Sequence, residues 1–156
     1  MGEHLYPYII FLPAGRKQSV LRSIFGSKVP IDILNFSISQ GISKKIYQKD
    51  LIESLHYSNK TVIGHLRELT DLGILKENME KSKRDGRTFW IKCYTLSDSG
   101  KWFALLLAKE DALSKGEKAE IIQNVFQSYL KWVKKLLEKL GVDKNILKEI
   151  FVKEIQ

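Results

Sequence analysis

Apolar residues between positions 58 and 72 recur with the spacing of one helical face. They are separated by 4, 3 and 3 residues and are Val62, Leu66, Leu69 and Leu72. Ser58 is a good N-cap in front of this run, and Gly73 is a natural C-terminal stop behind it. A shorter amphipathic segment, 48–55, precedes it across the link His56-Tyr57. The pattern predicts two helices joined by a tight turn.

After Gly73 the pattern changes to the alternation that is typical of strands. Residues 74–81 and 87–96 are candidate strands, and Asp85-Gly86 between them is a hairpin turn signal. In the second strand, side chains of two sets point to opposite faces: Phe89, Ile91 and Cys93 against Trp90, Lys92, Tyr94 and Leu96. Ser97 then caps a predicted helix over 98–113.

The N-terminal part predicts an arm and two helices. Residues 1–15 form the arm, with an extended segment over 5–12 whose prolines disfavour helix. A helix is expected over 16–26, and a second begins at Pro30 and ends at Gly41. The second helix has apolar residues over most of its surface, which favours a place in the core.

The C-terminal third predicts a long helix over 117–140 and a short one over 143–154. Six apolar positions of the long helix follow spacings of 4, 3, 4, 3 and 4: Ile122, Phe126, Tyr129, Val133, Leu136 and Leu140. That spacing is typical of a seam between paired helices, so we expect these residues to form a homodimer interface. The alternative is that the helix folds back on its own domain.

The fold class is therefore mainly α with a small antiparallel β-hairpin. We expect an arm over 1–15, a domain over 16–113, and C-terminal helices over 114–156. The 156-residue chain is 44% hydrophobic, which is enough for a core. Its apolar runs stay short of the roughly 18 residues that span a bilayer, so no membrane partner is expected. Its start lacks the features of a signal peptide, and the expected location is the cytoplasm.

The formal net charge is +8, which favours a polyanionic partner, although it also serves solubility. Cys93 is the single cysteine, and the histidines His4, His56 and His65 are scattered. These residues have no metal-ligand spacing, and the chain has no glycine-rich phosphate loop. We expect no metal, no cofactor and no enzymatic activity.

The outer surface of the helix over 58–72 carries residue types that can contact the bases or the phosphates of DNA. They are Ser58, Asn59, Lys60, Thr61, Ile63, Gly64, His65 and Arg67. Asparagine can pair with adenine edges, and arginine or lysine with guanine edges or phosphate. Glycine would let the backbone approach the duplex closely. The alternative for Ile63 and Gly64 is packing against a neighbouring helix.

Two further groups of residues are candidates for contact with the DNA backbone. The hairpin tip holds Lys81, Lys83, Arg84 and Arg87. Such a tip can reach phosphates or the minor groove, although charged loops are often only solvated. A second group lies where the first helix of the pair is expected to cross the DNA backbone and would orient the protein: Lys44, Lys45 and Tyr47.

Three sequence stretches carry a resemblance to a known family. They are Ser58-Asn-Lys-Thr-Val, Leu66-x-x-Leu-x-x-x-Gly-Ile-Leu and Tyr94-Thr-Leu-Ser-Asp-Ser-Gly-Lys. Together with the upstream VLRSIFGSKVPIDIL, they resemble winged-helix transcription regulators of bacteria and archaea, in the outline shared by the ArsR, MarR and PadR groups. The resemblance covers about residues 19–107.

The resemblance implies a winged helix-turn-helix and a homodimer on a near-palindromic operator, usually as a repressor. It also implies DNA contacts by Ser58, Thr61, Arg84 and Arg87. The pair Ile63-Gly64 departs from the polar pair of many relatives. The metal-sensing branch is excluded because its thiol or histidine clusters are missing.

The favoured hypothesis is a dimeric regulator that binds double-stranded DNA in a sequence-specific way. One alternative is a DNA architectural protein of low sequence specificity. Another is a winged helix that serves as a protein-interaction module. The sequence assigns no small-molecule effector.

Overall fold

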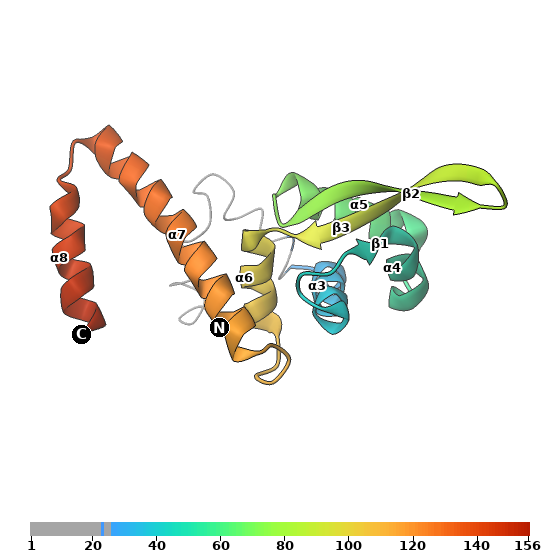
Figure 1. Ribbon diagram of the computed structural model, residues 1–156, viewed down its shortest axis with the longest axis horizontal. Helices are drawn as coiled ribbons and strands as arrows, with labels where there is room; N and C mark the ends of the chain where they lie inside the picture. The colour runs from blue at the N-terminus through green and yellow to red at the C-terminus, as the bar shows by residue number, and fades with distance from the viewer. Residues whose placement is uncertain (1–22, 24–25) are drawn as a thin grey trace.

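The computed structural model describes Ser23 and residues 26–156 (Figure 1). Its elements are α3 (Lys28–Gln40), β1 (Ile46–Tyr47), α4 (Gln48–Leu55), α5 (Asn59–Asp71), β2 (Leu75–Arg84), β3 (Arg87–Leu96), α6 (Asp98–Leu107), α7 (Lys115–Leu140) and α8 (Lys144–Ile155). The prediction of a mainly helical fold with a small antiparallel sheet is confirmed. The arm over 1–15 and nearly all of the helix over 16–26 lie outside the described residues.

The sheet has three strands rather than the two of the predicted hairpin. Its order is β1-β3-β2, and all neighbours are antiparallel. In β1, Ile46 pairs with Tyr94 and Tyr47 pairs with Cys93. Ile46 is 2% exposed, so this short strand also contributes to the core.

The hairpin is longer than predicted and projects beyond the helices at one end of the molecule (Figure 1). β2 runs to Arg84 instead of ending at residue 81, and only Asp85 and Gly86 form the turn. Their φ angles are 52° and 73°, and two positive values are what the tightest hairpin turns need. The basic residues Lys81 and Lys83 therefore lie in a strand rather than in a loop.

Capping residues set the helix boundaries, and they shift several predicted ones. Ser27 accepts a hydrogen bond from the Val29 N–H, so α3 begins two residues before Pro30. α6 ends at Leu107 rather than at 113, because the chain turns into an extended conformation at Ala108. Ser114 and Glu117 cap α7 reciprocally, so this helix begins at 115 rather than 117. Asp143 likewise caps α8, which covers 144–155.

The core forms where α3, α4, α5 and α6 meet the sheet. The predicted stripe of α5 is buried: Val62, Leu66 and Leu69 are each 0% exposed, whereas Leu72 is only half-buried. They join buried residues of the neighbouring elements: Ile33, Leu34, Leu51, Ile74, Leu75, Leu96, Phe103 and Ala104. Burying one side of α5 leaves its opposite side available to a partner.

Ser97 joins the start of α6 to the turn between α5 and β2. Its backbone N–H donates to the carbonyl oxygen of Ile74 at 3.0 Å. Its hydroxyl lies 2.6 Å from the carbonyl oxygen of Gly73 and accepts from the N–H of Gly100 at 3.0 Å. Gly100 is buried so closely against this turn that a β-carbon there would overlap the carbonyl oxygen of Ile74.

We predict that Gly100→Ala destabilises the protein by about 1–3 kcal/mol, because the added methyl group overpacks a backbone contact that cannot move aside. Urea unfolding measures this change. The matched control is Gly116→Ala in α7, where a β-carbon meets only the Ser114 hydroxyl at 3.9 Å. Equal unfolding midpoints for the two variants would contradict the role given to this contact.

Candidate nucleic-acid interface

The outer surface of α5 carries the basic residues Lys60 and Arg67, and acidic residues follow near its C-terminal end. Asn59, Lys60 and Arg67 are exposed, as predicted for residues opposite the buried stripe. Glu68 and Asp71 are also exposed but lie near the C-terminal end of the helix. A polyanion would therefore meet favourable charge at Lys60 and Arg67 and unfavourable charge at the C-terminal end of α5.

The N-terminus of α5 is built by two hydroxyl residues. The Ser58 hydroxyl accepts from the Thr61 N–H at 3.1 Å, and the two side-chain oxygens lie 2.8 Å apart. The predicted cap at Ser58 is confirmed. Backbone N–H groups of the first turn point out of a helix N-terminus, which makes this end suited to a phosphate group.

The two residues that depart from the family pattern have different surroundings. Gly64 is exposed, and a β-carbon there would meet nothing within 4 Å, so it does not pack against a neighbouring helix. Ile63 is half-buried and lines a small cavity between α5 and the sheet, together with Lys92 and Tyr94. Packing explains in part why an apolar side chain stands at position 63. It does not explain why position 64 is a glycine.

His65 lies closer to the core than the prediction placed it. Its side chain is 24% exposed, and Nδ1 lies 3.6 Å from a carboxylate oxygen of Glu68. This position at the edge of the buried stripe makes it a weaker candidate for contact with a partner than Lys60 or Arg67.

The register of the hairpin divides its side chains between two faces. One face, here called the helix-side face, holds Met79, Lys81, Lys83, Thr88, Trp90 and Lys92. It also holds Glu77 and Tyr94, which line the small cavity against Ile63 and Arg67 of α5. The helix-side face therefore continues the surface of α5 along the hairpin. The opposite face holds Arg84, Arg87 and Phe89.

Sequence reasoning missed the exposed apolar residues of the helix-side face. Trp90 is 57% exposed and Met79 is 50% exposed. The Lys81 ammonium lies 5.2 Å from the centre of the Trp90 ring, within the range of a cation–π interaction. Aromatic and basic residues side by side suit the stacking and phosphate contacts of nucleic acids. The signal in the sequence was the spacing of Trp90 and Lys92, because residues two apart in a strand lie on the same face.

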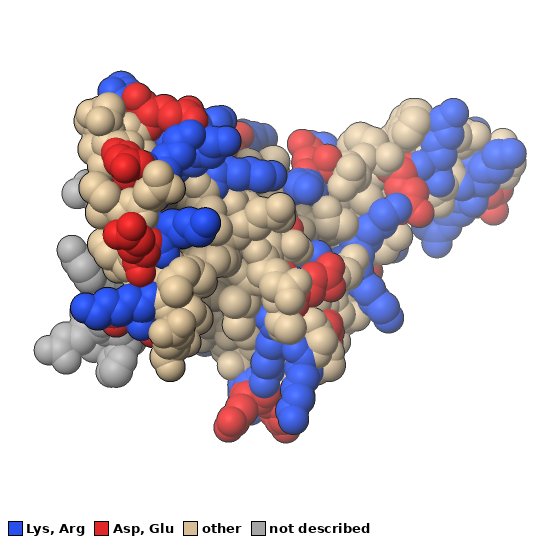
Figure 2. All heavy atoms as spheres, turned by 60° about the vertical axis from the view of Figure 1, so that its left-hand side comes forward, with Lys and Arg blue, Asp and Glu red and all other residues tan. Residues whose placement is uncertain are grey.

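Arg84 and Arg87 face each other as the last pair of the hairpin. Like charges at directly opposite positions destabilise a sheet, and Asp85 in the turn offsets this only in part. A second anion at the tip would relieve the repulsion. In Figure 2, blue lysine and arginine side chains gather on the projecting hairpin.

Lys44, Lys45 and Tyr47 do not lie on the first of the two short helices. The two lysines are exposed in the loop after α3, and Tyr47 belongs to β1. The Tyr47 hydroxyl donates to the Glu80 carboxylate at 3.0 Å, and the Lys45 ammonium lies 3.6 Å from the same oxygen. The hydrogen bond to Glu80, followed by burial, raises the pKa of Tyr47. Tyr47 therefore ties β1 to the hairpin, and Lys44 is the better candidate for a backbone contact.

Cys93 is a buried residue of β3, 0% exposed, with its sulfur 3.6 Å from the carbonyl oxygen of Asn78. Burial raises the pKa of the thiol, so little reactive thiolate forms near neutral pH. The interpretation of Cys93 as a small core residue agrees with these surroundings.

The six predicted seam positions of α7 do not share one environment. Phe126 and Val133 turn toward α8, where the Phe126 ring lies 5.4 Å from that of Phe151. Ile122, Leu136 and Leu140 stay exposed, and Tyr129 is half-buried 6.2 Å from the Trp132 ring. The buried positions of α7, Ile121 and Val125, were not among the six. Part of the stripe therefore lies toward α8 within the chain, and the homodimer seam stays a prediction.

Neither a metal site nor a membrane span emerges from the described part of the chain. Over Ser23 and residues 26–156, side chains of His, Cys, Asp and Glu form no group of three that could hold a metal ion. Within the same residues, no helix combines the length and apolar character that crossing a membrane requires.

Comparison with known proteins gives limited similarity. No family model matches the chain, and no curated protein matches it. One solved structure, a possible transcriptional regulator from Methanosarcina mazei Go1, aligns over 88% of this chain and 87% of its own. The two are 17% identical, with a TM-score of 0.34.

Proposed function

We propose that this protein is a winged-helix regulator of transcription that binds double-stranded DNA as a homodimer. In this proposal the first half of α5 enters the major groove, and the hairpin is the wing that follows the phosphate backbone or the minor groove. The exposed apolar residues of α7, Ile122, Leu136 and Leu140, contribute to the contact between two copies. The role in regulation, usually repression, comes from the family resemblance.

One observation supports the proposal: α5 and the helix-side face of the hairpin border the same small cavity, which Asp71 and Glu77 also line. Ile63 and Arg67 share a small cavity with Lys92 and Tyr94, so the helix and the hairpin present one joint surface. Lys60, Lys81 and Lys83 add positive charge along it. A convex helix beside a basic ribbon matches the groove and the adjacent phosphate strand of a duplex.

A DNA architectural protein of low sequence specificity is the second candidate, and Trp90 with Met79 favours it. Apolar residues that project from a basic ribbon can wedge between base steps in the minor groove, which bends the duplex without reading its sequence. The two candidates differ in the ratio of specific to non-specific affinity. A third candidate, a protein-interaction module, predicts no affinity for a duplex at physiological salt.

Fluorescence anisotropy tests these candidates with a duplex from upstream of the protein's own gene and a scrambled duplex of equal length. A self-regulating protein is expected to bind the upstream duplex at least about a thousandfold more tightly. Equal, salt-dependent affinities would support the architectural candidate. The absence of binding to either duplex would contradict DNA binding.

We predict that the double variant Arg84→Ala/Arg87→Ala binds DNA more weakly than the unmodified protein. The log–log salt dependence of its affinity should be flatter by about one unit for each phosphate that the arginines no longer neutralise. Titrations at several salt concentrations measure this slope. A matched control, Lys131→Ala/Lys139→Ala, removes the same charge from exposed positions of α7 and should leave the slope unchanged. An unchanged slope in the arginine variant would remove the hairpin tip from the interface.

We predict opposite effects of Gly64→Ala on folding and on DNA binding. Alanine at this open helical position should stabilise the fold by about 1 kcal/mol, because glycine is a poor helix former. If the α5 backbone approaches the duplex, the added methyl group should weaken binding roughly tenfold. Thermal unfolding and anisotropy measure the two effects. Greater stability with unchanged affinity would show that Gly64 lies away from the duplex.

A further inference from the structure

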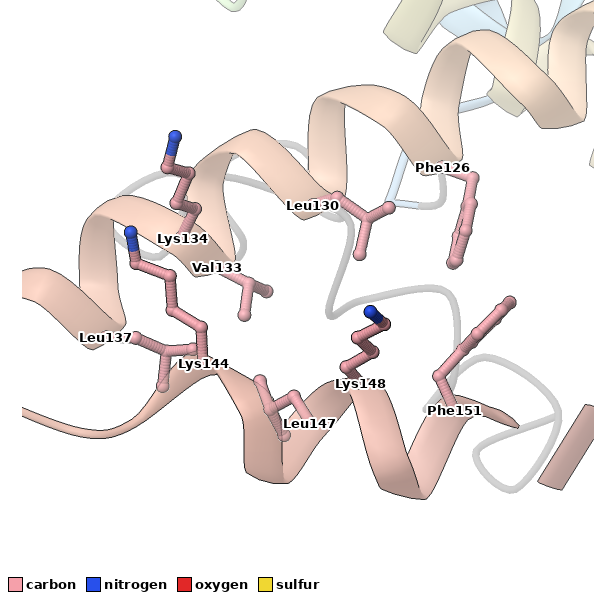
Figure 3. A pocket seen from close by; sticks show the side chains of 9 residues that line it. All are labelled: Phe126, Leu130, Val133, Lys134, Leu137, Lys144, Leu147, Lys148 and Phe151. Carbon is pink, nitrogen blue, oxygen red and sulfur yellow. The ribbon is translucent and has the colours of Figure 1, made fainter. Parts of the chain in front are cut away.

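The space between α7 and α8 is an apolar groove of about 320 Å³ with a basic rim (Figure 3). Its walls are Phe126, Leu130, Val133 and Leu137 from α7, and Leu147 and Phe151 from α8. The two phenylalanine rings face each other at one end of the groove. Its volume is at the lower end of the roughly 300–1,000 Å³ that proteins use for small organic ligands.

The charged residues that line the groove are all lysines: Lys134, Lys144 and Lys148. The Lys144 ammonium donates to the Glu138 carboxylate at 2.8 Å, so its charge is compensated. Lys148 rises from α8 toward α7 between the apolar walls (Figure 3). An occupant of this groove would therefore meet an apolar interior and net positive charge at the rim.

The uniform sign of the rim distinguishes between two possible occupants. In a two-fold dimer the same patch of both copies meets itself. If a second copy filled the groove in this way, lysines would face lysines, and nearby like charges repel. An amphipathic anion instead matches both parts, with its chain in the apolar interior and its carboxylate beside an ammonium.

We propose that the groove between α7 and α8 binds an amphipathic organic carboxylate, such as a medium-chain fatty acid. The chain lies between Leu130, Val133 and Leu147, and the carboxylate accepts hydrogen bonds from Lys148. The ligand bridges α8 and α7, since the α8 residues that line the groove, Leu147, Lys148 and Phe151, are also exposed. This site does not depend on the proposed DNA binding, and its test needs no duplex.

Isothermal titration calorimetry of the full chain with decanoate tests the site. Decyltrimethylammonium, with a chain of the same length and the opposite charge, is the ligand control. We expect saturable binding of decanoate and at least about tenfold weaker binding of the cation. Equal affinity for both ligands would overturn the role of the lysine rim.

Two pairs of variants locate the site within the C-terminal helices. Leu130→Gln and Lys148→Gln change the groove, and both should weaken decanoate binding, by about tenfold and about fivefold. Ile146→Gln and Lys135→Gln are matched controls, because these exposed residues of α8 and α7 do not line the groove. The controls should keep the affinity of the unmodified protein. Circular dichroism should show the same helix content in all four variants.

Two other outcomes would overturn the proposal. If Leu130→Gln and Ile146→Gln weaken binding equally, decanoate adsorbs on apolar surface in general. If decanoate does not bind and Leu130→Gln converts a dimer to a monomer in sedimentation, a second copy fills the groove. Either result leaves the DNA experiments unaffected, so the two proposals stand or fall separately.

Discussion

The contact between the start of α6 and the turn after α5 determines how the two ends of this molecule are placed. Ser97 binds the turn through its backbone and its hydroxyl, and Gly100 allows the helix to touch the Ile74 carbonyl. On one side of this contact, α5 and the hairpin are held in one body. On the other side, α6 packs against α7, whose Ile121 and Val125 are buried. A substitution here would therefore change the spacing between the basic hairpin and the apolar groove of α7 and α8.

The features that the sequence predicted well are those whose energies are local. Caps at Ser58 and Ser97 need only a hydroxyl and the next turn of backbone, and the Asp85-Gly86 turn needs only two permissive residues. Strand β1 could not be predicted in this way. It has two residues, and it exists because Ile46 pairs with Tyr94, far along the chain.

The candidate site shows the same division between local and long-range information. The buried stripe of α5 fixed which side of that helix is free, and the register of the hairpin follows from its turn. The sequence did not say which hairpin face continues α5, because that depends on how Ile63 packs against Tyr94. The six predicted seam positions of α7 divide between two surroundings for a related reason. Its apolar arc is wide enough for two contacts, and Phe126 and Val133 are directed to α8.

The charge and apolar character of each surface indicate which kind of partner that surface can bind. Glu68 and Asp71 place negative charge near the C-terminal end of α5, while the hairpin adds lysines and arginines to the positive charge of Lys60 and Arg67. The groove of α7 and α8 is also basic, but its interior is apolar, so a phosphate backbone would leave that interior in water. A polyanion is thus better matched by the hairpin end and a small amphipathic anion by the helical end. Within the described residues α6 contacts both α7 and the sheet, so it joins these two parts of the molecule.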